Sequence, residues 1–156
     1  MTDREKDHAS VRLPPPFVLF GHLAAAFLLG WRVHLPLPLP FPARLLGVGT
    51  VLLGLLLAYT AIRAMIAART PVDPYEAVTA LVVTGPYRLT RNPIYLGFVC
   101  CLTGLPLALG TYWGLLLVPP MVVVMNRLIV RHEEAYLEGK FGQYYRAYKS
   151  SVRRWL

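Results

Sequence analysis

A thirteen-residue stretch, residues 85–97 with the sequence GPYRLTRNPIYLG, concentrates much of the chemistry that this chain offers. It places arginine, asparagine and tyrosine side chains directly before a long apolar run. Polar and charged groups are costly to keep beside hydrocarbon, and where they occur they mark functional sites. We therefore take this stretch as the first candidate for a binding or catalytic site.

A second charged cluster, residues 131–134 with the sequence RHEE, follows the last apolar run. Arginine binds a carboxylate through two parallel hydrogen bonds, a helix start binds anions, and aromatic faces attract a sulfonium or ammonium. A glutamate binds an ammonium or ribose hydroxyls. S-adenosylmethionine presents all of these groups, so it would suit the two clusters together. The residues alone leave another reading open, in which Arg88 and Arg91 pair with Glu133 or Glu134 merely to hold two helices together.

The composition indicates a membrane protein. Of the 156 residues, 56% are hydrophobic and 15% are charged, against about 25% charged in a soluble domain. Only Asp73 and Glu76 among the acidic residues lie away from the two ends of the chain. The net charge of +8 is typical of contact with anionic membrane lipids, and no basic run interleaved with aromatics supports nucleic-acid binding.

We predict a single all-α membrane domain, residues 1–156, with about four transmembrane helices. The apolar runs that form them are residues 17–33, 45–68, 94–109 and 115–130. The connector 35–42 has proline at every second position, so we expect it to be extended. The third and fourth helices form a tight hairpin, and residues 131–156 form an amphipathic tail.

Lysine and arginine predict the orientation of this domain. Fourteen lie on the face that carries both termini and residues 85–97, and two lie on the other face. The excess of Lys and Arg on cytoplasmic loops places both termini in the cytoplasm, and the Ala-, Gly-, Pro- and Arg-rich composition indicates a bacterial inner membrane. The hairpin then brings residues 85–97 beside residues 131–134, and together with the tail they form a predicted cytoplasmic binding region.

No metal site is expected. Cys100 and Cys101 are adjacent within an apolar run, where they read as small packing residues, and the four histidines have no metal-ligand spacing. His22 lies inside the first apolar run. We interpret it either as a helix-facing polar side chain satisfied by a neighbour or as a substrate contact.

Residues 81–156 resemble the isoprenylcysteine carboxyl methyltransferases and their relatives among the phospholipid methyltransferases. The family pattern is GPY-x-x-x-R-[HN]-P-x-Y-x-G, then E-E-x-x-L, F-G-x-x-Y-x-x-Y and V-x-R-[WF], and this chain contains each part in order. Asn92 stands where eukaryotic members have histidine, so that position cannot carry a charge here.

The resemblance implies an integral-membrane enzyme that uses S-adenosylmethionine without a Rossmann domain and takes a lipophilic substrate from the bilayer. The implied catalytic residues are Glu133, Glu134 and Arg91. The implied cofactor-binding residues are Gly85, Tyr87, Arg88, Arg91, Asn92, Pro93, Tyr95, Gly97, Glu133, Glu134 and Tyr145. The candidate substrate-binding residues are His22, Arg154 and Trp155.

The methyl acceptor is left open between two chemistries. A carboxylate, as in a prenylcysteine, is ionised at neutral pH and needs no general base, which favours it slightly. A phospholipid amine, such as the ethanolamine headgroup, is protonated and needs a base, and both glutamates could already be engaged by the cofactor. Two readings from other classes are a sterol-reductase-like enzyme that binds NADPH and a membrane adaptor without activity.

Overall fold

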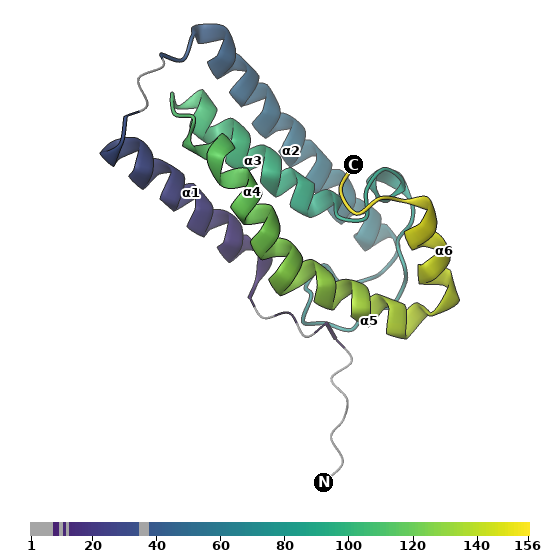
Figure 1. Cartoon of the computed structure of the whole chain (residues 1–156). Coiled ribbons are helices and arrows are strands. Elements are labelled where there is room, and N and C mark those ends of the chain that lie inside the picture. The colour runs from purple at the N-terminus through teal and green to yellow at the C-terminus, as the bar shows by residue number, and fades with distance from the viewer. Residues whose placement is uncertain (1–7, 10, 12, 35–37) are drawn as a thin grey trace.

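The computed structural model describes residues 8, 9, 11, 13–34 and 38–156, and this part of the chain is helical without any strand. Its long helices run roughly alongside one another, with α5 and α6 at one end (Figure 1). The elements are α1 (Pro15–Arg32), α2 (Phe41–Ala67), a 3-10 turn (Gly85–Arg88), α3 (Pro93–Ala108), α4 (Trp113–Met125), a π-helical turn (Asn126–Val130), α5 (Arg131–Phe141) and α6 (Gln143–Ser151).

Within the described residues, two helices are long and apolar enough to cross a membrane, so the expected four crossings are supported in part. They are α2, with 27 residues, and the continuous helix Trp113–Phe141, with 29. The second would be about 43 Å long at 1.5 Å per residue, well beyond the hydrocarbon core of about 30 Å. Its charged end, α5, therefore lies outside the membrane-crossing part, which we take as residues 113–130.

The structure corrects two expected boundaries. α2 begins at Phe41, so residues 41 and 42 of the proline-rich connector are helical; a proline is tolerated in a first helical turn, where its missing N–H has no partner to lose. Residues 35–37 of that connector lie outside the described residues. The last apolar helix does not end at residue 130 but continues through the π turn to Phe141, and it stops only before Gly142, which has φ +53°.

The contact between α2 and α3 depends on glycine. Gly54 faces Gly97, and a Cβ on Gly97 would lie 2.7 Å from the Gly54 carbonyl oxygen. Gly47 faces Gly104 in the same way: a Cβ on Gly47 would lie 2.7 Å from the Gly104 carbonyl oxygen. Small residues let helices approach closely in lipid, where packing rather than hydrophobic burial joins them. Gly97, an expected cofactor residue, therefore packs between two helices.

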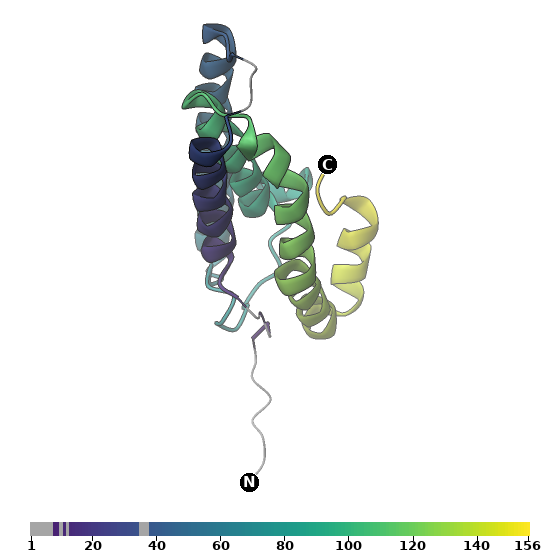
Figure 2. The same cartoon turned by 60° about the vertical axis from the view of Figure 1, so that its left-hand side comes forward.

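The chain turns place the candidate binding residues at one end of the helices. At the opposite end, the indole N–H of Trp113, at the α3–α4 turn, donates to the Val33 carbonyl 3.0 Å away. Figure 2 shows the described residues that directly precede α1 at the same end as α5, and α6 folded back beside α5. Ala9 and Val11 of that segment are buried against the core.

Replacing Gly54 with alanine is expected to destabilise the protein by about 1–3 kcal/mol, the usual effect of overpacking. The new Cβ would lie 2.6 Å from the Cys100 Cβ. Gly49 is the matched control, because nothing lies within 4 Å of a Cβ there, so Gly49→Ala should keep or slightly raise stability. Thermal unfolding in detergent measures both, and equal effects would contradict the close helix contact.

Candidate functional site

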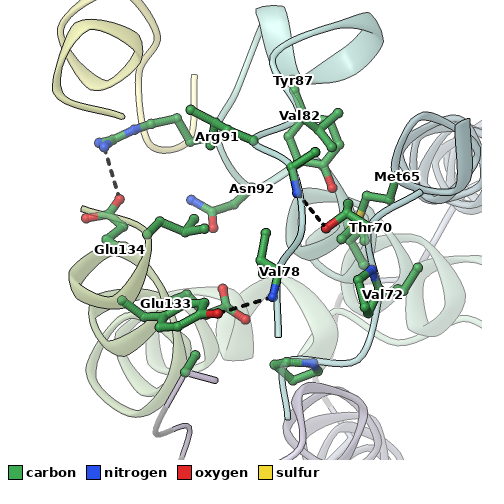
Figure 3. A pocket seen from close by; sticks show the side chains of 18 of the residues that line it. Met65, Thr70, Val72, Val78, Val82, Tyr87, Arg91, Asn92, Glu133 and Glu134 are labelled. Carbon is green, nitrogen blue, oxygen red and sulfur yellow. Dashed lines mark hydrogen bonds and ion pairs between the residues drawn. The ribbon is translucent and has the colours of Figure 1, made fainter. Parts of the chain in front are cut away.

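A pocket opens at the end of the helices that carries α5 and α6. Its walls are the segment 70–82 on one side and the start of α3 with α5 and α6 on the other (Figure 3). It encloses about 910 Å³ of space, part of which is open to solvent. The expected site residues that line it are Tyr87, Arg91, Asn92, Pro93, Tyr95, Glu133, Glu134 and Tyr145.

Six other expected site residues do not line this pocket. Gly85 and Arg88 are exposed in the 3-10 turn, and Gly97 packs on α2. His22 borders a separate hollow between α1 and α4, and its Nδ1–H donates to the Val18 carbonyl 2.7 Å away within its own helix. The remaining two, Arg154 and Trp155, lie outside the lining, although Arg154 contacts a residue within it.

Glu134 joins two arginines that are far apart in the sequence, and we call Arg91, Glu134 and Arg154 the Glu134 cluster. The Arg154 Nε and Nη2 donate to the two Glu134 oxygens at 2.9 and 2.6 Å. The Arg91 Nη1 lies 3.2 Å from Glu134 Oε1. Glu134 is buried, and its hydrogen bonds raise the pKa of Arg154 above its usual range. Arg154 therefore stays charged, and this glutamate is already engaged by protein.

Residues 90–92, directly before α3, are hydrogen-bonded to the carboxyl-terminal segment near Arg154. The Arg91 N–H donates to the Arg153 carbonyl at 3.0 Å. The Thr90 hydroxyl and the Asn92 amide both donate to the Arg154 carbonyl, at 3.0 and 2.9 Å. Asn92 borders the pocket, but its side-chain amide holds the carboxyl-terminal segment in place.

Arg91 keeps unused hydrogen-bonding capacity inside the pocket. Its Nε and Nη1 are buried, and neither makes a hydrogen bond with the described residues; the 3.2 Å approach of Nη1 to Glu134 is an ion pair without hydrogen-bond alignment. Buried donors without partners are rare in folded proteins, because each loses its contact with water. The Arg91 guanidinium is thus suited to bind an anionic group in the pocket.

Glu133 is in a different environment from its neighbour. It accepts a hydrogen bond from the Tyr95 hydroxyl at 2.5 Å, and it pairs with no lysine or arginine of the described part. Burial raises the pKa of its carboxyl to about 7, with the charge of Glu134 adding to this effect and the Tyr95 hydrogen bond opposing it. At neutral pH it can therefore accept a proton or neutralise a positively charged ligand.

The segment 70–82 was not assigned any role from the sequence, although it forms one wall of the pocket. Its irregular backbone is held by side chains: Thr70 Oγ1 accepts the Thr79 N–H at 3.0 Å, and the Tyr136 hydroxyl accepts the Val78 N–H at 3.2 Å. Tyr148 also lines the pocket, and its hydroxyl donates to the Tyr87 carbonyl at 2.7 Å. The sequence signal for a role of the segment 70–82 was its valines, which recur through an otherwise polar connector and indicate that one of its sides is buried.

Glu134→Ala is expected to destabilise the protein by roughly 3 kcal/mol, the lower end of the range for breaking a buried pair, since Arg154 is partly exposed. Glu138 is the control, because its pair with Lys149 at 3.1 Å is much more exposed than the Glu134 cluster and its loss should matter by less than about 1 kcal/mol. Thermal unfolding in detergent compares the two variants. A similar loss in both would show that the Glu134 cluster is not a buried anchor.

Comparison with known proteins agrees with the resemblance seen in the motifs. A family model described as phospholipid methyltransferase matches residues 42–144. An uncharacterized protein of Haemophilus influenzae is 43% identical over 63 residues, which are 40% of this chain and the whole of that relative. No solved structure matches the chain. Because the family match spans about two thirds of the residues, this chain belongs to the phospholipid methyltransferase family, a family of membrane methyltransferases.

Proposed function

We propose that the protein transfers a methyl group from S-adenosylmethionine to a lipophilic acceptor that enters from the bilayer. The observation that carries this proposal is Arg91, which borders a pocket built from the family motifs and whose buried Nε and Nη1 make no hydrogen bond with the described residues. A guanidinium in this state suits the carboxylate of the cofactor's amino-acid part. When bound, S-adenosylmethionine supplies a methyl carbon activated by its sulfonium.

The residues of the pocket can bind and orient such a cofactor. Glu133 has no cationic protein partner among the described residues, so its carboxylate can balance an ammonium or a sulfonium. The aromatic rings of Tyr87 and Tyr145 border the same space and favour a positive charge near their faces. Glu134 serves indirectly, because both of its oxygens are engaged by arginine.

The pocket also supports access from lipid. Met65 of α2, Ile94 of α3 and Leu137 of α5 give it an apolar side, which can exclude water from the reacting groups. Methyl transfer is an in-line displacement in which the protein mainly positions the two reactants. Because the pocket lies at the end of the helices that carries the basic tail, the proposed site faces the cytoplasm of a bacterial inner membrane.

The proposed acceptor is a carboxylate of the isoprenylcysteine type, which is ionised and needs no base. A phospholipid amine is the second candidate, and a specific observation favours it: Glu133 lines the pocket with a pKa of about 7. Such a carboxyl can take the proton of an ammonium headgroup. The description of the matching family as phospholipid methyltransferase supports the same candidate.

Radiolabelled S-adenosylmethionine and the purified protein in lipid nanodiscs test the function directly. We expect label to enter either a prenylcysteine analogue or phosphatidylethanolamine, and the labelled product identifies the acceptor. Failure to bind S-adenosylmethionine by calorimetry would refute the proposal and favour an adaptor. Protection against thermal unfolding by NADPH, but not by S-adenosylmethionine, would instead favour a reductase.

Arg91→Ala is expected to weaken S-adenosylmethionine binding by roughly 10- to 100-fold, the loss of hydrogen bonds to a charged group. Arg88→Ala should leave the affinity unchanged, because Arg88 is exposed outside the pocket. Calorimetry on both variants separates two arginines that are both expected cofactor residues and lie only three positions apart. Equal losses, or none in either variant, would contradict the assigned pocket.

If the acceptor is an amine, the rate should rise with pH through about 7, because the deprotonated Glu133 accepts the proton and its pKa lies there. Glu133→Gln should then lower kcat by about 10²- to 10⁴-fold, the usual contribution of a general base, and remove this step from the pH profile. A carboxylate acceptor predicts neither effect. Initial rates between about pH 5.5 and about pH 9 distinguish the two chemistries.

A further inference from the structure

Arg154 influences the pocket without being part of its lining. Its guanidinium holds both oxygens of Glu134, at 2.9 and 2.6 Å, with the geometry of a bidentate pair. Arg91, which borders the pocket, approaches the same carboxylate at 3.2 Å but forms no aligned hydrogen bond with it through Nη1. Two arginines thus contact one buried carboxylate, and Arg154 makes the aligned hydrogen bonds to it.

We propose that Arg154 is a positioning residue: by donating to both oxygens of Glu134, it leaves the buried Arg91 Nε and Nη1 donors available to bind an anionic group in the pocket. This inference rests on the proposed function, because it assumes that Arg91 binds the carboxylate of S-adenosylmethionine. It assigns to Arg154 a role different from the direct substrate contact expected from the sequence.

The competition follows from the burial of Glu134. A buried carboxylate requires hydrogen bonds from protein, since leaving it unpaired is strongly unfavourable. Without Arg154, the Glu134 oxygens have Arg91 as their remaining cationic partner in the cluster. A full pair between these two residues would use the Arg91 donors and neutralise its charge, so the pocket would lose its anion-binding group.

The backbone keeps Arg154 in this position. Its carbonyl accepts hydrogen bonds from the Thr90 hydroxyl and the Asn92 amide, and the neighbouring Arg153 carbonyl accepts the Arg91 N–H. The segment that carries Arg154 is therefore attached to the same stretch that carries Arg91. The side chain of Arg153 is exposed and takes no part in the Glu134 cluster, so Arg153 provides a control of the same type at the next position.

Calorimetric titration of the full chain in detergent with S-adenosylmethionine tests the role. Arg154→Ala should raise Kd about tenfold, a typical effect of a residue that acts through a neighbour, and Arg153→Ala should stay within about twofold of wild type. Arg154→Lys should be intermediate, because an ammonium cannot bind both carboxylate oxygens as a planar fork does. An unchanged Kd in Arg154→Ala would overturn the proposal.

A second measurement does not require any ligand. Arg91→Ala and Arg154→Ala each leave Glu134 with one arginine, whereas the double variant leaves the buried carboxylate with neither. The drop in Tm of the double variant should therefore exceed the sum of the two single drops. Additive drops would overturn the shared use of Glu134. If the wild type fails to bind S-adenosylmethionine, the proposed function is wrong, and so is the role of Arg154 in anion binding. Non-additive drops in Tm would in that case still show that both arginines pair with Glu134.

Discussion

The burial of one carboxylate, Glu134, between two arginines connects three segments beside the pocket that are far apart in the sequence. Arg91 precedes α3, Glu134 lies in α5, and Arg154 follows α6. A buried charge has to be paired, and the separation of these residues in the sequence means that pairing them closes the structure around the pocket. The pairing thereby holds Arg91 beside the pocket.

Adjacent glutamates serve different purposes because their surroundings differ. Glu134 accepts hydrogen bonds from arginine and stays within the protein framework. Glu133 lines the pocket and accepts a hydrogen bond from the Tyr95 hydroxyl. Because it is buried, its pKa is raised to about 7. Two neighbouring carboxyl groups with separated pKa values can divide structural and chemical work between them. The paired sequence Glu-Glu does not reveal which of the two has which role.

Much of the fold follows from local patterns, and less of the site does. Apolar runs and proline positions locate most helix ends to within a few residues, and the closely spaced motifs identify eight of the residues that line the pocket. The same motifs also include Gly85 and Gly97, which lie elsewhere. A motif records that a residue type recurs at a spacing, but it does not distinguish a ligand contact from a glycine needed for helix packing.

The sequence by itself determined the class of the protein: an all-helical, basic, strongly apolar chain with the motifs of a methyltransferase family. Hydropathy and charge are sums over neighbouring residues, so they can be read without knowing the fold. Only the tertiary structure decided that Arg154 takes Glu134, that Asn92 holds the carboxyl-terminal segment, and that the segment 70–82 forms a wall. These are contacts between distant residues, and competition among several possible partners is resolved only when all of them are packed together.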